Sequence, residues 1–199
     1  MNRDDFQALV RQAGQDLYRD MPWRTVTSPY FILVSELMLQ QTQVERVIPK
    51  FTAFMEYFPD VVALASASQA EVLRAWSGLG YNRRAMYLHQ AAKKIATDFG
   101  GVIPPVRSQL LELPGVGPST SAAILAYSFD QPVVFIETNI RTVYFHHYFA
   151  DATIVHDKEL LATVRDTLDH AHPRQWYWAL MDYGNHLKRA GMGRINQSA

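Results

Sequence analysis

The spacing of hydrophobic and polar positions is helical along most of the chain. From Ala85 onward, apolar residues recur every three or four positions as far as Phe99, and Gly100 and Gly101 follow directly. This period is that of one face of an α-helix, and glycine commonly ends a helix. No segment combines sustained apolar–polar alternation with the turn residues of a β-hairpin. The pattern therefore predicts an all-α protein of roughly ten helices.

Residues that favour helix starts recur between the apolar segments. Ser28 before Pro29 is typical of an N-cap followed by proline at the first helical position. Capping boxes are predicted for Thr42 with Glu45 and for Ser68 with Glu71. Gly117-Pro118 is predicted to open a helix from Ser119 to Phe129, Asp157 to cap a helix that runs to about Asp169, and Pro173 to start the last helix. Only Pro132 to Ile136 is typical of a strand, and it stands alone.

Composition narrows the class of protein. The chain has 199 residues, is 48% hydrophobic and contains no cysteine, so it can bury a sizeable core but cannot form disulfides or cysteine-held metal sites. The apolar runs are too short to span a bilayer, and the polar N-terminus does not resemble a signal peptide. We therefore expect a cytoplasmic protein without a membrane segment.

The formal net charge is zero, with 19 basic and 19 acidic residues, but the charges are unevenly distributed. The segment from Arg74 to Lys94 has five basic residues and no acid, and residues 188–199 have three basic residues and no acid. From Asp151 to Asp169, five acids stand against two bases. A basic cluster can attract a polyanion even on a neutral protein. A solvated helix face is an equally good interpretation of these charges alone.

The segment from Leu111 to Thr120 reads Leu-Glu-Leu-Pro-Gly-Val-Gly-Pro-Ser-Thr. It predicts two helices joined by a tight turn, because Gly115 and Gly117 allow sharp bends and close approach of a ligand to the backbone. Free N–H groups at the start of the second helix form an anion site. Such a turn would hold phosphate without reading base sequence. The alternative is an ordinary connection between two packed helices.

This turn resembles the helix–hairpin–helix (HhH-GPD) base-excision DNA glycosylases, the superfamily of endonuclease III and adenine DNA glycosylase. The resemblance covers residues 22–184 and is closest to the catalytic domain of A/G-specific adenine glycosylases. It is carried by the hairpin and by Pro22–Arg24, Pro29–Val44, Trp76–Tyr81, Glu137–Arg141 and Met181–Gly184. It implies two helical lobes that flank a DNA-binding cleft. Residues 22–133 would form the lobe with the hairpin, and residues 1–21 and 134–199 the other.

The resemblance assigns catalysis to two carboxyl groups. Glu36 occupies the position of the acid that protonates the leaving purine, and its apolar helix should raise its pKa. Glu137 occupies the position of the carboxylate that stabilises the developing oxocarbenium ion, where the adenine glycosylases have aspartate. The extra methylene of glutamate moves the carboxylate by roughly 1.5 Å. The site can have shifted to accommodate it, the substrate can differ, or activity can be weak.

The same resemblance implies two sets of binding residues. Those expected to contact or support the flipped base are Trp23, Arg24, Gln40, Gln41, Ser119 and Asp182. Those expected at the DNA are Asn82, Arg83, Arg84, Gly115, Gly117, Ser119, Asn139 and Arg141. Asn82 is interpreted as replacing an intercalating tyrosine of the adenine glycosylases, so that Gln41 would supply more of the wedge.

Several departures from the family pattern limit the chemistry. Ser119 stands where bifunctional members have a Schiff-base lysine, so β-elimination by that route is excluded. Lys188 stands at the first position of the family's four-cysteine cluster, so no iron–sulfur cluster is expected. The family's C-terminal domain for recognising oxidised guanine is missing from this sequence. A K⁺ or Na⁺ ion held by the carbonyls of Leu111, Leu113 and Val116 is expected from the family.

The resemblance thus favours a monomeric, monofunctional DNA glycosylase, associated with the nucleoid if its source is bacterial. It would hydrolyse the N-glycosidic bond of a mispaired or damaged base in double-stranded DNA, with an adenine-type mispair as the first candidate. One alternative is a non-catalytic or weakly active module that senses distorted duplex. Another is a protein-interaction domain without DNA binding, whose affinity for duplex would depend little on salt.

Overall fold

The structure is a computed structural model and describes residues 1–193. Within these residues the chain forms twelve helices and no strand, which confirms the all-α prediction with two more helices than expected. The helices are α1 (Arg3–Asp16), α2 (Pro22–Thr25), α3 (Pro29–Leu39), α4 (Val44–Tyr57), α5 (Val61–Ser66), α6 (Gln69–Ala75), α7 (Arg83–Asp98), α8 (Arg107–Leu111), α9 (Pro118–Phe129), α10 (Thr138–Tyr148), α11 (Asp157–Thr167) and α12 (Pro173–Arg189). No helix in this range is long and apolar enough to cross a membrane.

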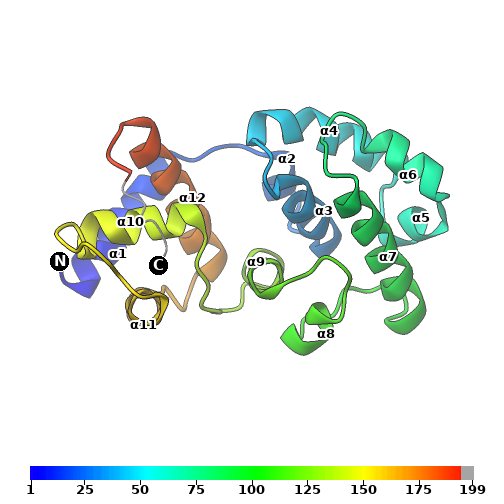
Figure 1. The fold of residues 1–199 in the computed structure, drawn as a ribbon. Coiled ribbons are helices and arrows are strands. Elements are labelled where there is room, and N and C mark those ends of the chain that lie inside the picture. Colours follow the sequence, from blue (N-terminus) through cyan, green and yellow to red (C-terminus); the bar gives the residue numbers. More distant parts are fainter. Residues whose placement is uncertain (194–199) are drawn as a thin grey trace. The chain divides into compact units, whose positions relative to one another are not determined.

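The helices form two compact units (Figure 1). Unit 1 consists of residues 1–19 and, among the described residues, 130–193, and it contains α1 and α10 to α12. The long helix α12 packs against both α1 and α10. Phe6 of α1 lies at the centre of the core of unit 1. Its ring centroid is 5.1 Å from that of Tyr144 and 5.9 Å from that of Trp176. Aromatic packing therefore joins the two ends of the chain in one unit.

Unit 2 consists of residues 20–129 and contains α2 to α9. Its central helix is α3, which packs against α4, α7 and α9. A helix enclosed by neighbours can be apolar all round, and α3 buries seven of its eleven residues. As predicted, α3 begins after Ser28 with Pro29 in its first turn. This packing fixes the backbone that carries Glu36.

Some local predictions were right and others wrong. The capping box of Ser68 and Glu71 forms as predicted. The box predicted for Thr42 and Glu45 does not, because Gln43 is the N-cap of α4 and makes no side-chain capping bond. The Thr42 hydroxyl instead accepts a 3.1 Å hydrogen bond from Arg84. The Thr42 hydroxyl is therefore bonded to a guanidinium that is distant in sequence and does not cap α4.

The segment 132–136 is not a strand, and this prediction was wrong. Its Val133 carbonyl accepts a 2.6 Å hydrogen bond from the Tyr177 hydroxyl, and the ring centroids of Phe135 and Tyr177 are 4.3 Å apart. The apolar run therefore packs onto α12 rather than pairing with another strand. Asp157 is the first residue of α11 rather than its cap, and its carboxylate pairs with Arg141 at 2.6 Å.

Candidate functional site

The turn between α8 and α9 presents its backbone to solvent. Gly115 has a φ of +81°, and a Cβ there would lie 2.8 Å from the Cβ of Tyr87, so conformation and packing both require glycine. A Cβ at Gly117 would meet no atom within 4 Å, and Gly117 and Ser119 are exposed. The N–H groups of Ser119 and Thr120 donate to no backbone carbonyl among residues 1–193. The turn can therefore hold an anion through its backbone.

Glu36 is the single charged residue of α3. Its neighbours Leu33 and Leu37 are 0% and 1% exposed, whereas Glu36 is half-buried. The helix therefore holds one carboxyl group at the edge of an apolar environment in unit 2. This placement suits a proton donor whose position must be fixed.

The guanidinium of Arg84 lies inside unit 2. It donates to the carbonyls of Leu37 and Met38 at 3.1 and 2.9 Å, and to those of Leu79 and Gly80 at 3.2 Å each. Arg84 is buried, with only 7% of its surface exposed. It therefore joins the end of α3 to the loop before α7 and is not available to a DNA phosphate, which corrects the sequence interpretation. Carbonyl groups at a helix end are natural partners for this cation.

Gln41 and Tyr81 are exposed residues that adjoin backbone carbonyls to which Arg84 donates hydrogen bonds. Gln41 has a φ of +53° and Tyr81 a φ of +48°, a region that non-glycine residues adopt rarely. Tyr81 is 63% exposed, and the Arg84 guanidinium lies 5.3 Å from its ring centroid. The Gln40 carbonyl also accepts a hydrogen bond from Arg84. Exposed residues with a strained backbone that are held by the same side chain, here Arg84, are typical of a binding surface.

The sequence interpretation did not propose Tyr81 as a site residue. Tyr81 follows Gly80, which has a φ of +73°. Asn82, which was interpreted as the position of an intercalating tyrosine, is the exposed N-cap of α7. Arg83 is exposed, with its guanidinium 5.8 Å from the ring centroid of Tyr87. An exposed tyrosine stacks on bases far better than an asparagine does, so Tyr81 is the better candidate for a wedge.

Trp23 and Arg24 lie in the short helix α2 and are buried, with 5% and 6% of their surfaces exposed. The Trp23 ring packs edge-on against Phe51, with the centroids 5.2 Å apart. Trp23 is thus part of the core of unit 2, whatever else it contacts.

Glu137 belongs to unit 1 and is the N-cap residue of α10. Its side chain makes no capping hydrogen bond, so it is not used to close the helix. Burial raises the pKa of this carboxyl group. A carboxylate that is poorly solvated interacts strongly with any positive charge that develops beside it.

Helix α12 packs closely against the first turn of α10. A Cβ at Gly184 would lie 2.2 Å from the carbonyl oxygen of Asn139, so only glycine allows the two helices to approach this closely. Lys188 donates a 2.8 Å hydrogen bond to the Asn139 Oδ1, and burial lowers the pKa of this lysine. The Asn139 side chain is therefore held by α12, two residues after Glu137.

Two more predicted residues have partners within unit 1. Asp182 is 2% exposed, and its carboxylate accepts hydrogen bonds from Arg19 Nε at 2.6 Å and from the Arg19 backbone N–H at 3.2 Å. Arg141 pairs with Asp157 at 2.6 Å. These contacts give Asp182 and Arg141 structural roles in addition to those the resemblance implies.

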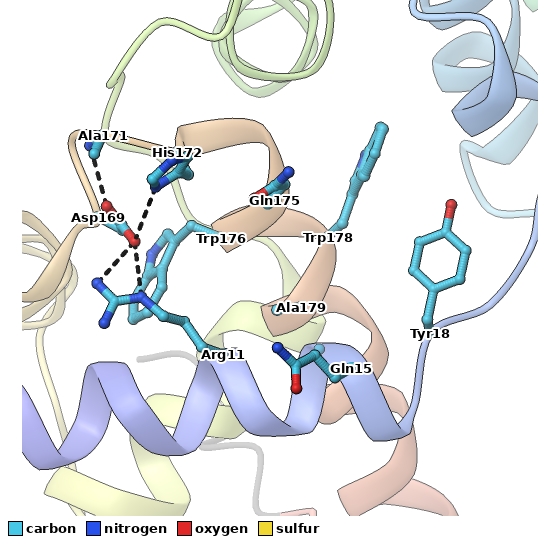
Figure 2. Close-up of a pocket in the computed structure, with 11 residues that line it drawn as sticks. Arg11, Gln15, Tyr18, Asp169, Ala171, His172, Gln175, Trp176, Trp178 and Ala179 are labelled. Atoms are coloured by element: carbon cyan, nitrogen blue, oxygen red, sulfur yellow. Dashed lines mark hydrogen bonds and ion pairs between the residues drawn. The ribbon is translucent and has the colours of Figure 1, made fainter.

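Unit 1 also contains a pocket of about 710 Å³ that includes none of the predicted site residues (Figure 2). It lies between α1 and the start of α12, with aromatic walls from Tyr18, Trp176 and Trp178. Asp169 and Arg11 form an ion pair of 2.9 Å at one side. The pocket is therefore lined by an ion pair and by three aromatic residues, of which Trp176 is buried, Trp178 half-buried and Tyr18 exposed.

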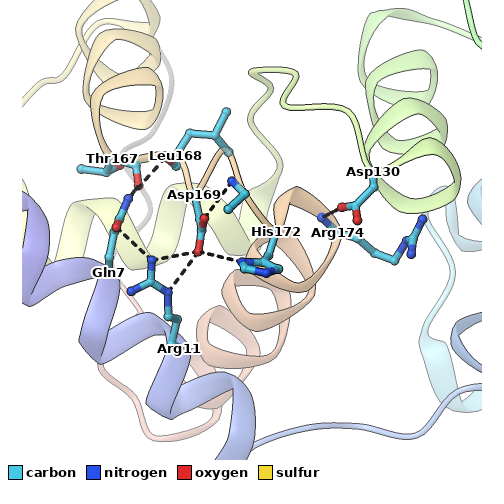
Figure 3. Close-up of polar contacts among 9 residues, drawn as sticks. Gln7, Arg11, Asp130, Thr167, Leu168, Asp169, His172 and Arg174 are labelled. Carbon is cyan, nitrogen blue, oxygen red and sulfur yellow. Dashed lines mark hydrogen bonds and ion pairs between the residues drawn. The ribbon is translucent and has the colours of Figure 1, made fainter.

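The polar contacts around Asp169 attach the loop between α11 and α12 to α1 (Figure 3). Gln7 donates to the carbonyls of Thr167 and Leu168 at 3.0 and 3.3 Å, and its Oε1 accepts a 3.0 Å hydrogen bond from Arg11. Burial acts to raise the pKa of Asp169, but hydrogen bonds from Arg11 and Ala171 and the Arg11 charge outweigh it and leave the pKa lowered. The network stabilises the fold.

A cysteine-ligated cluster does not fit the residues present. The chain contains no cysteine, and Lys188, at the expected first ligand position, is an ammonium engaged with Asn139. Among residues 1–193, no group of three or more histidine, cysteine or acidic side chains could hold a metal ion.

Known proteins resemble this chain in sequence over more than half of its length. Residues 34–168 match the model of the family described as "HhH-GPD superfamily base excision DNA repair protein". An adenine DNA glycosylase of Mycolicibacterium smegmatis is 47% identical over 126 residues, which cover 63% of this chain and 43% of that protein. One from Buchnera aphidicola is 34% identical over 167 residues, covering 83% and 48%. The chain spans about half the length of the curated relatives it matches.

Solved structures show the same fold. A thermostable thymine-DNA glycosylase superposes with a TM-score of 0.83 at 26% identity, covering 92% of this chain and 85% of that one. The 3-methyladenine DNA glycosylase of H. pylori, bound to 1,N6-ethenoadenine, gives a TM-score of 0.73 at 16% identity, covering 98% and 100%. The second likeness concerns the fold alone.

Proposed function

The chain belongs to the HhH-GPD superfamily of base excision DNA repair proteins, and on that premise we propose that it is a monofunctional DNA glycosylase. It would hydrolyse the N-glycosidic bond of a mispaired or damaged base in duplex DNA, as a monomer. Relatives at 34–47% identity are adenine DNA glycosylases, which supports adenine as the base removed.

The observation that carries the proposal is the placement of Glu36. Loss of a purine from deoxyribose needs a proton on the leaving base. Glu36 is the one charged residue of the largely apolar helix α3, in the same unit as the exposed hairpin turn. A general acid held on a rigid helix can deliver its proton to a base that is extruded from the duplex.

Glu137 supplies the second carboxyl group. As the bond to the base breaks, positive charge develops on the sugar, and an ionised carboxylate beside it lowers the barrier. Burial raises the pKa of Glu137, which makes its charge costly in the free protein and its attraction to an oxocarbenium ion strong. Excision should therefore fall as the pH is lowered and Glu137 becomes protonated.

The hairpin and the loop before α7 would hold the duplex. The backbone N–H groups of Ser119 and Thr120 would bind a phosphate, while Gln41 and Tyr81 would fill the space left by the extruded base. Ser119 has a hydroxyl where an imine would need an amine, so the expected product is an abasic site in an uncut strand.

The hairpin carbonyls fit a monovalent cation. The carbonyls of Leu111 and Val116 accept no backbone hydrogen bond within residues 1–193, and that of Leu113 accepts one from Val116 N–H at 3.1 Å. Unpaired carbonyl oxygens are ligands that K⁺ and Na⁺ accept. Bound there, the ion would add positive charge at the turn that meets the DNA backbone.

A panel of labelled duplexes tests the proposal. Each duplex carries one candidate pair, including adenine opposite guanine, 8-oxoguanine or cytosine, and thymine opposite guanine. After incubation, one aliquot is treated with hot alkali and one is not. We expect strand cleavage at an adenine mispair in the alkali-treated aliquot alone. Cleavage without alkali would contradict the monofunctional assignment, and uncut strands across the panel with intact duplex binding would favour the non-catalytic module.

A further inference from the structure

Two cations from α4 converge on the loop before α7. Arg46 Nη2 donates a 2.6 Å hydrogen bond to the Gly78 carbonyl. The side chain of Lys50 lies over Gly78, with Cε and Nζ at 3.1 and 3.2 Å from the place where a Cβ would stand. Gly78 has a φ of +92°, so both conformation and space call for glycine here. Arg46 and Lys50 are four residues apart and share one face of α4.

These two charges are not neutralised by the protein. Among the described residues, Lys50 makes no hydrogen bond or ion pair, and Arg46 bonds only to a carbonyl. The N–H groups of Gly78 and Gly80 donate to no backbone carbonyl within the same range. Two uncompensated cations beside glycine N–H groups form a donor set for an anion with several oxygens.

We propose that Arg46, Lys50 and the Gly78 loop form a second phosphate-binding site for the DNA backbone, separate from the hairpin. The inference rests on the proposed function only in requiring that the chain bind DNA. It names residues outside both sets that the family resemblance implies.

The position of the loop favours a phosphodiester strand over a single free anion. The loop leads directly into Arg83, the first residue of α7, and the hairpin packs on the same helix at Tyr87, through Gly115. Four residues along a helix correspond to a rise of about 6 Å. The Gly78 loop and the hairpin thus both adjoin the first turns of α7, which suits a ligand with phosphates at regular intervals. The exposed Tyr81 lies in the connecting loop, where a base could stack.

The test is the salt dependence of binding to an undamaged, labelled duplex, measured by fluorescence anisotropy. Wild type is compared with Lys50→Met, Arg46→Gln and the double variant. Lys158→Met is the matched control, because Lys158 is exposed and lies on α11 in the acidic segment, outside the basic segment from Arg74 to Lys94. Lys50→Met is the cleanest variant, since it removes no hydrogen bond within the protein.

The plot of log K against log salt has a negative slope, and each lost phosphate contact makes that slope shallower by about 0.9. Between about 50 and 200 mM salt, wild type should therefore lose about 3.5 times more affinity than Lys50→Met, and Lys158→Met should match wild type. An unchanged slope for Lys50→Met would overturn the inference, even if its affinity fell, because a structural role does not change the number of released ions. If wild type itself failed to bind duplex, the proposed function would fail as well.

Discussion

Replacing Arg84 by methionine should destabilise unit 2 strongly. The methionine side chain fills similar space but donates no hydrogen bonds. The carbonyls of Leu37, Met38 and Leu79 would then lose buried hydrogen bonds from the guanidinium. The end of α3 and the loop before α7 would no longer be joined, although both carry residues proposed to enter the duplex.

The size of the effect follows from the number of unpaired groups. A buried carbonyl that loses its partner costs about 1 kcal/mol at the low end of the usual range, so three cost about 3 kcal/mol. For a chain of this length, 1 kcal/mol corresponds to roughly 2–4 °C in Tm. The expected fall in Tm for Arg84→Met is therefore roughly 6–12 °C.

Differential scanning calorimetry checks this with two further variants. Arg83→Met is the control, because the neighbouring arginine is exposed and should change Tm little. Arg84→Lys retains the charge, but one ammonium cannot reach both α3 and the loop, so its Tm should be intermediate. A Tm for Arg84→Met equal to that of Arg83→Met would refute the structural role of Arg84.

Three other variants probe strain, packing and titration. Gln41→Gly should raise the free energy of unfolding by about 1 kcal/mol while lowering excision, because Gln41 holds a φ of +53°. Equal or lower stability in urea would contradict this. Gly184→Ala should cost about 1–3 kcal/mol, since its Cβ would lie 2.2 Å from the Asn139 carbonyl oxygen, and an unchanged urea midpoint would refute that packing. Burial lowers the pKa of His147, which contacts the Tyr183 hydroxyl at 2.8 Å, from 6.5 to about 4. Its folded-state pKa is depressed, so this contribution to stability is present above pH 6.5 and is lost as the pH falls towards 4. His147→Gln should flatten that part of the pH dependence, and an identical pH dependence would count against it.

The helical architecture could be predicted because its signals are local. The apolar spacing from Ala85 and the Ser68–Glu71 box each concern residues within one or two turns of one another. The lone strand at 132–136 was predicted wrongly because β-branched residues favour extended backbone, while its actual partner, Tyr177, lies more than forty residues away. Extended backbone alone does not make a strand without a partner to pair with.

The same difference between local signals and long-range contacts applies to the residues of the site. The family resemblance implied a DNA contact for Arg84, yet Arg84 shares a helix face with Leu88 and Ala91, both 0% exposed. Helical phase could have indicated its burial. The contact between Lys50 and Gly78 joins residues 28 positions apart, and no sequence period relates them. Such contacts are set by packing, which the sequence pattern does not specify.

Single-turnover excision from a duplex with an adenine mispair tests the central claim most directly, comparing wild type with Glu36→Gln and Glu137→Gln. Duplex binding by each variant is measured in parallel. Each substitution should reduce the excision rate by at least about 100-fold and leave duplex binding intact, because general acid and charge stabilisation contribute factors of this size. Excision by both variants at the wild-type rate would contradict the assignment of the two carboxyl groups.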